Sequence, residues 1–202
     1  MYEVWRAPEV VVAFGTLLAG GAALWGAFTA SRGLNRWKDQ KEWEDSRQLA
    51  REIALKSRAC SDSFHALRSP FMSAGEMDAA YREKFDEAVD QFDTGATEQA
   101  AMLALNVRLG HLNEPMKELY PKLIEADILW HTNLEKVHSE MRSLINKVVT
   151  AHELKNIGST GEQTIQYRRT AYGLRDDDIG VAFEGLVSKL VETGAGRLKP
   201  NK

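Results

Sequence analysis

Four side chains of metal-ligating types recur at helical spacing in the middle of the sequence. They are Asp127, His131, Glu135 and His138, at successive steps of four, four and three residues. On one helix this spacing places all four along one strip. Carboxylate and imidazole groups at such spacing hold iron or manganese in di-metal helical bundles, which draw E-x-x-H motifs from two helices. Because Glu135 with His138 is the one clear instance here, we expect a solvated flank with internal ion pairs and keep a metal site as the alternative.

A second polar cluster lies in the stretch "YRRTAYGLRDDD" and contains Arg168, Arg169, Tyr172 and Arg175. Positive charge beside aromatic surface suits an acidic partner, a lipid headgroup or a nucleotide. The three aspartates at 176–178 would repel a polyanion, and carboxylates of this kind are favoured at a helix N-terminus. We therefore expect salt bridges between helices, with anion binding as the alternative.

The sequence shows no catalytic constellation. Its single cysteine, Cys60, lies five residues before His65, which separates the two side chains by about 140° around a helix axis. Cys60 falls on the same apolar stripe as Phe64, so a core cysteine is expected. The segment "GSTGEQT" lacks the lysine of a phosphate-binding loop and is expected to be a connection. No enzyme activity and no cofactor are predicted.

The segment 10–30, "VVVAFGTLLAGGAALWGAFTA", has no charged side chain over 21 residues. As a helix it would be about 32 Å long, close to the roughly 30 Å hydrocarbon core of a bilayer. A buried core helix normally keeps a polar edge, and a signal peptide has a shorter apolar region and a small-residue cleavage site. We therefore expect a retained transmembrane helix.

Basic residues are concentrated after this segment, at Arg32, Arg36, Lys38 and Lys41, whereas Arg6 is the one before it. The richer flank stays in the cytoplasm. We expect residues 1–9 to be a short extracytoplasmic N-terminus, too small for a domain, and the rest of the chain to be cytoplasmic. A lone cysteine fits a reducing compartment.

Small residues recur every fourth position along the expected span, at Gly15, Ala19, Ala23 and Ala27. Such a strip lets two transmembrane helices approach closely. It predicts pairing with another span or with a second copy of the chain, although small residues are also simply common in such helices.

The remaining residues read as helices. Residues 31–58 are rich in charges of both signs and should form a juxtamembrane helix that enters a bundle domain at 59–193, followed by a flexible tail at 194–202. Pro70 should end the first helix, and Ser73 with Glu76 has the spacing of a capping box. Later helices are expected at about 97–112, 121–156 and 178–193, with an interruption near Gly110 and Pro115.

Apolar residues at helical period define the expected core faces. These are Leu49, Ile53, Cys60, Phe64, Leu67 and Phe71 in the first helix, Leu123, Trp130, Leu134, Val137, Met141, Leu144 and Val148 in the long one, and Val181, Phe183, Leu186, Val187, Leu190 and Val191 in the last. No segment requires a strand, so the predicted fold is all-α: one transmembrane helix followed by an antiparallel helical bundle.

A short N-terminal anchor, a charged helix leading to "ALRSPFMSAGE", a central helix with a tryptophan and a closing "YGLRDDD" segment form the overall layout. This layout resembles uncharacterised bacterial single-pass membrane proteins with helical cytoplasmic domains. The resemblance implies a location in the bacterial inner membrane and carries over no functional residue.

Taken together, these patterns predict a membrane-anchored interaction or scaffold protein, because tethering raises the effective concentration of a binding surface. The expected partners are the lipid bilayer and an unidentified protein, with a homo-oligomer also open. The formal net charge of −3 argues against a nucleic-acid partner. The alternative is a membrane-tethered bundle that senses a ligand or a metal.

Overall fold

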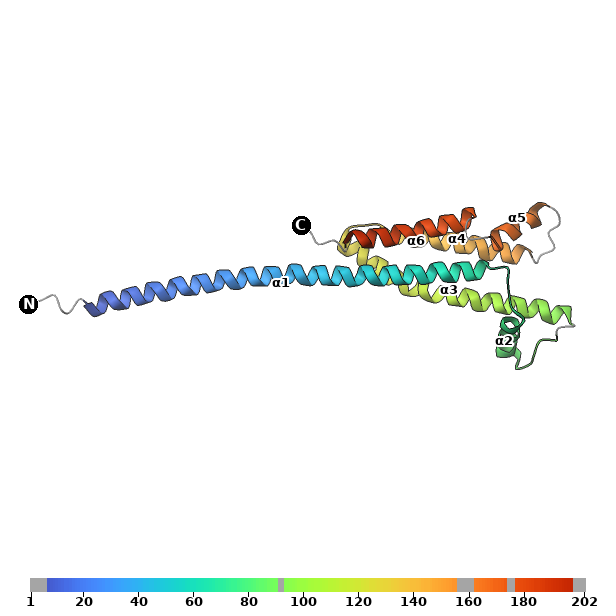
Figure 1. Cartoon of the computed structure of the whole chain (residues 1–202), viewed down its shortest axis with the longest axis horizontal. Coiled ribbons are helices and arrows are strands. Elements are labelled where there is room, and N and C mark those ends of the chain that lie inside the picture. Colours follow the sequence, from blue (N-terminus) through green and yellow to red (C-terminus); the bar gives the residue numbers. More distant parts are fainter. Residues whose placement is uncertain (1–6, 91–92, 156–161, 174–176, 198–202) are drawn as a thin grey trace, which may run out of the picture. The chain divides into compact units, whose positions relative to one another are not determined.

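The computed structural model describes residues 7–90, 93–155, 162–173 and 177–197. Within these ranges the chain forms six helices and no strand, which confirms the all-α class (Figure 1). The helices are α1 (Ala7–Arg68), α2 (Ala74–Phe85), α3 (Thr94–Trp130), α4 (Leu134–Lys155), α5 (Glu162–Ala171) and α6 (Asp178–Arg197). The chain divides into two compact units, 1–45 and 46–202, and α1 contributes residues to both.

The described part of unit 1 (residues 7–45) is the N-terminal portion of α1. Its large apolar side chains from Val11 to Trp37 are open to the surroundings, from 50% exposed at Phe28 to 75% at Leu24. Among the described residues α1 is the one helix long and apolar enough to cross a membrane, and none of its apolar window is buried. Beyond this window residues 31–42 are all exposed, and Lys41 pairs with Asp45 at 3.5 Å.

Unit 2 (residues 46–202) has a closed apolar core. The core joins one face of α1, from Leu49 onward, to α3, α4 and α6. Phe64 of α1 and Phe183 of α6 stack with ring centroids 3.9 Å apart and almost parallel planes. Nearly all of the apolar positions expected in the long central segment are buried in this core: Leu123, Trp130, Leu134, Val137, Met141 and Val148, with Leu144 packed against them.

Contacts between neighbouring helices assemble unit 2. Helix α2 packs on α3, α3 packs on α4, and α4 also contacts α5 and α6. Two ion pairs join α1 to α3: Lys56 to Glu118 at 2.5 Å and Glu52 to Lys122 at 2.8 Å. Helix α4 thus contacts three other helices.

The predicted break after α1 and the start of α2 are confirmed. Helix α1 ends at Arg68, two residues before Pro70. Ser73 is the N-cap of α2, and its hydroxyl oxygen accepts a hydrogen bond from the backbone N–H of Glu76 at 3.1 Å. The helix then ends at Phe85, because Asp86 adopts the left-handed conformation with φ of 55° and donates its backbone N–H to the carbonyl of Arg82.

The central helices differ from the prediction in a way that matters for the site. The expected helices at 97–112 and 121–156 are replaced by α3, which continues through Pro115 and Pro121, and by α4. The two carbonyl groups that lose a helical partner at these prolines belong to His111 and Lys117, which are exposed and accessible to water. The chain breaks instead at His131, which has a φ of 53°.

Three further expectations are wrong. Helix α6 continues to Arg197 rather than ending at 193, because Gly194 lies buried against Ala50 and Arg197 donates a hydrogen bond to the carbonyl of Trp130 at 3.0 Å. Of the predicted tail, 198–202 lies outside the described residues. Phe71, expected in the core, is 87% exposed because it follows the end of α1, and the expected core residues Val181 and Val191 of α6 are also exposed.

Candidate functional site

Asp127, the first residue of the candidate metal strip, caps a helix. Its Oδ1 accepts hydrogen bonds from the backbone N–H of Leu134 at 2.6 Å and from the Thr132 hydroxyl at 2.8 Å, and its Oδ2 accepts from the N–H of Glu135 at 2.9 Å. Desolvation raises the pKa of this carboxyl, but the two N–H groups and the hydroxyl favour the charged form and bring the pKa below its usual value. A carboxylate near the end of α3 thus accepts hydrogen bonds from the free backbone N–H groups at the start of α4.

The other three members of the strip lie in different surroundings. His131 is exposed in the turn between α3 and α4, and Glu135 accepts a hydrogen bond from the Tyr120 hydroxyl at 3.0 Å. His138 is buried, with Nε2 3.3 Å from the carbonyl oxygen of Met116, and desolvation lowers its pKa. The four residues do not share one helix as expected. Among the described residues no group of three or more His, Cys, Asp or Glu side chains is placed to hold a metal ion.

The described members of the arginine and tyrosine cluster differ in exposure. Arg168 and Arg169 are exposed on α5, while Tyr172 packs edge-on against His152 with centroids 4.7 Å apart. Arg175 lies outside the described residues. Tyr167, in contrast, turns out to line a cavity.

The salt bridge expected from this region exists, but its cation comes from α1. Arg68 is 1% exposed and pairs with Asp177, which directly precedes α6. Its guanidinium also donates to the backbone carbonyls of Thr170 at 3.3 Å and Arg169 at 3.4 Å. Sequence reasoning missed Arg68, because a single arginine at the end of a helix carries no local sign of burial.

The polar residues around Cys60 form a second buried cluster. Burial raises the pKa of the Cys60 thiol to about 12, so the thiol stays protonated at neutral pH. The next residue, Ser61, donates its hydroxyl to Oε1 of Glu184 in α6, and His65 Nε2 lies 2.7 Å from the same oxygen. His65 is therefore held by a carboxylate and does not contact Cys60. The sequence offered one sign of this cluster: Ser61 and His65 are four residues apart, a spacing that places them on the same face of a helix.

In unit 1 the four small residues Gly15, Ala19, Ala23 and Ala27 are exposed on α1. A Cβ placed on Gly15 would have open space around it. The strip is accessible along the helix.

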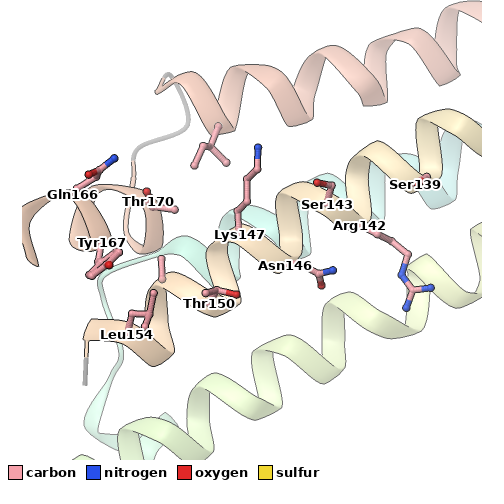
Figure 2. A pocket seen from close by; sticks show the side chains of 12 residues that line it. Ser139, Arg142, Ser143, Asn146, Lys147, Thr150, Leu154, Gln166, Tyr167 and Thr170 are labelled. Carbon is pink, nitrogen blue, oxygen red and sulfur yellow. The ribbon is translucent and has the colours of Figure 1, made fainter. Parts of the chain in front are cut away.

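A space in unit 2 lies between α4, α5 and α6. This α4–α5–α6 cavity has a volume of about 850 Å³ and is lined mainly by polar side chains (Figure 2). They are Ser139, Arg142, Ser143, Asn146, Lys147, Thr150, Gln166, Tyr167 and Thr170, joined by Ala151, Leu154 and Ile179. Sequence reasoning named none of the α4 residues, because they form no recognisable motif and most of them are exposed.

A second space, the α3–α4 cavity, has a volume of about 690 Å³ and includes the buried His138 and Tyr120. Their rings lie 4.9 Å apart at an angle of 35°. Arg142 and Asn146 of α4 line both cavities, so the α4–α5–α6 cavity and the α3–α4 cavity lie on adjacent sides of α4.

Within the described residues the fold is thus all-α, with one helix long and apolar enough to cross a membrane, and unit 2 includes the α4–α5–α6 and α3–α4 cavities. No protein family, no curated protein and no solved structure matches the chain.

Proposed function

We propose that this protein is a single-pass, membrane-anchored interaction protein without catalytic activity. The N-terminal part of α1 lies in the bacterial inner membrane, residues 1–9 lie outside, and unit 2 forms an antiparallel helical bundle at the cytoplasmic face. There the bundle binds a protein partner, and membrane confinement strengthens a weak contact by raising its effective concentration.

The observation that carries the anchoring is the exposure of the apolar segment in unit 1. Leu17, Leu18, Leu24 and Trp25 are each about 70% exposed or more. A contiguous apolar surface of this kind is unfavourable in water and favourable in hydrocarbon. Unit 2 of the same chain buries its own apolar face in a closed core.

The anchoring is tested with charges placed in the apolar segment. Leu17→Arg with Leu18→Arg adds about 2.5–3.5 kcal/mol per arginine to the insertion free energy. We expect the full-length chain to resist extraction from membranes at alkaline pH and the double variant to be released. Gln40→Arg with Gln48→Arg, which adds the same charge at exposed positions farther along α1, should behave as the unmodified chain. Extraction of the unmodified chain without detergent would overturn the anchoring.

The orientation is tested with single cysteines, because the buried Cys60 does not react with a maleimide at neutral pH. In intact spheroplasts an impermeant maleimide should label Glu3→Cys and should label Asp39→Cys only after the membrane is disrupted. The reverse pattern would overturn the cytoplasmic location of unit 2.

An exposed apolar strip on α3 supports the interaction role. It consists of Pro121, Ile124, Ile128 and Leu129, and Ile128 is 68% exposed. A photo-crosslinking residue at Ile128 should give one adduct with a membrane-bound protein, whereas the same residue at the exposed Lys189 of α6 should give none. Ile124→Glu should remove the adduct. An adduct with a second copy of the chain would identify a homo-oligomer, and the absence of any adduct at Ile128 would overturn the role of this strip.

Two features of the described residues support the absence of catalysis. The Cys60 thiol is buried and protonated, and the Ser61 hydroxyl donates to Glu184. Both residues are fully buried, so neither group is accessible as a nucleophile.

A further inference from the structure

The α4–α5–α6 cavity has the dimensions of a ligand site. Its volume of about 850 Å³ falls within the roughly 300–1,000 Å³ range of small-molecule pockets. Three helices of unit 2 contribute lining residues, so the cavity depends on the tertiary structure of that unit. It exceeds what a bare phosphate or sulfate ion would fill.

The lining of this cavity is rich in hydrogen-bond donors and carries positive charge. Arg142 and Lys147 supply two cations, and none of the described lining residues is a carboxylate. Arginine and lysine side chains donate and cannot accept hydrogen bonds. Five hydroxyl groups add adaptable partners, on Ser139, Ser143, Thr150, Tyr167 and Thr170. The complementary ligand carries negative charge and several acceptor oxygens.

Lys147 is the cation best placed inside this cavity. It extends from α4 toward α6, whereas Arg142 and Asn146 extend from the other side of α4, where they also line the α3–α4 cavity (Figure 2). Within the part of the chain that the structure describes, no carboxylate forms an ion pair with Lys147. A bound anion would therefore meet an ammonium group that is not already neutralised.

The remaining walls can hold the organic part of a ligand. Tyr167 presents an aromatic ring from α5, and Leu154 and Ile179 add apolar surface from α4 and α6. Amide groups from Asn146 and Gln166 supply donors and acceptors for neutral polar groups.

We propose that the α4–α5–α6 cavity binds a small phosphate ester, with its phosphoryl group at Lys147 and its organic part between Tyr167 and Ile179. Phosphoryl oxygens are acceptors only and make charge-assisted hydrogen bonds with lysine. The ester is either a soluble molecule or the headgroup of a membrane lipid, since both present the same chemistry. The site adds ligand binding to the proposed anchoring and partner binding and does not depend on either.

The test uses the full-length chain in a maltoside detergent, which contains no phosphate. Titration calorimetry is carried out with adenosine 5′-monophosphate, glycerol 3-phosphate and short-chain phosphatidylglycerol, and with adenosine as the uncharged control. We expect binding of at least one phosphate ester, no binding of adenosine, and weaker binding at higher salt. Tighter binding of phosphatidylglycerol than of the soluble esters would identify a lipid source, and the reverse a soluble one.

A matched pair of variants locates the site. Lys147→Gln should weaken binding about tenfold or more, as loss of a charge-assisted hydrogen bond implies. Lys136→Gln removes the same charge from an exposed position of the same helix outside both cavities and should leave the affinity unchanged. Thr170→Val, which keeps the charge and removes a hydroxyl, should weaken binding by a smaller factor.

Three results would overturn the proposal: no binding of any of the three esters, equal weakening by Lys136→Gln and Lys147→Gln, or unchanged affinity in Lys147→Gln. Equal weakening would mean that diffuse surface charge attracts the anion. Circular dichroism of each variant verifies that the helices are retained, so a change in affinity reports on the cavity.

Discussion

Arg68 and Asp177 form a two-point salt bridge in the interior of unit 2. Nη1 of Arg68 donates to Oδ1 of Asp177 at 2.7 Å, and Nη2 donates to Oδ2 at 2.5 Å. Oδ1 of Asp177 also accepts the backbone N–H of Gly180 at 2.8 Å, so the same carboxylate caps α6. The pair joins the last residue of α1 to the first turn of α6, and parallel N–H to oxygen bonds of this type are strong and geometrically specific.

Removing the carboxylate should destabilise unit 2 strongly. Asp177→Ala leaves the Arg68 guanidinium buried without a counter-charge, a change that costs about 3–5 kcal/mol in comparable buried pairs. Urea titration of the full-length chain in detergent, followed by circular dichroism, measures the loss. Asp178→Ala changes the neighbouring exposed carboxylate and should cost less than about 1 kcal/mol. Equal losses in the two variants would show that the salt bridge contributes nothing specific.

The same pair should make the stability of unit 2 sensitive to acid. Hydrogen bonding to Arg68 holds the pKa of Asp177 below its ordinary value of 3.8. The unfolded chain therefore binds a proton more readily than the folded one. The stabilisation is fully present above pH 3.8 and is lost as the pH falls through the lower pKa of the folded state. Urea midpoints measured from about pH 6 downward should decrease in acid, with a smaller decrease for Asp177→Asn, and parallel curves for both proteins would contradict this.

Gly173 should be required for the salt bridge to close. A Cβ on this residue would lie 1.5 Å from Oδ2 of Asp177 and 1.9 Å from Nη2 of Arg68. We expect Gly173→Ala to cost about 1–3 kcal/mol, the range for overpacking a tight site. Gly185→Ala is the matched control, since a Cβ there meets open space on α6 and should stabilise the helix by roughly 0.5–1 kcal/mol. A Gly173→Ala variant as stable as the unmodified chain would show that the pair can move aside.

Asp127 should act as a helix cap and not as a metal ligand. Asp127→Ala removes the acceptor for the N–H groups of Leu134 and Glu135 and should lower the free energy of unfolding by about 0.5–2 kcal/mol. Addition of a chelator to the unmodified chain should leave the urea midpoint unchanged. If the chelator lowers that midpoint and bound metal is found at one atom per chain, the strip with His131, Glu135 and His138 holds a metal.

The sequence by itself determined the features that depend on local chemistry. The helical spacing of apolar residues predicted most of the core face from Leu123 to Val148. The prediction held even though the expected single helix is divided at His131 into α3 and α4. Pro70 and Ser73 marked the end of α1 and the start of α2. The uncharged segment 10–30 identified the helix that, in the described part of the chain, is long and apolar enough to cross a membrane. Each of these follows from residues within one or two helical turns of one another.

Only the tertiary structure decided which polar groups meet. Arg68 and Asp177 are 109 residues apart in sequence, and the α4–α5–α6 cavity combines side chains from three helices with no shared motif. The break at His131 also escaped prediction, because the helical spacing of apolar residues continues across it from Trp130 to Leu134 and the N–H groups of α4 are satisfied by a carboxylate from α3. A local pattern specifies a helix and its apolar face, whereas a salt bridge or a cavity depends on how helices distant in the chain pack together.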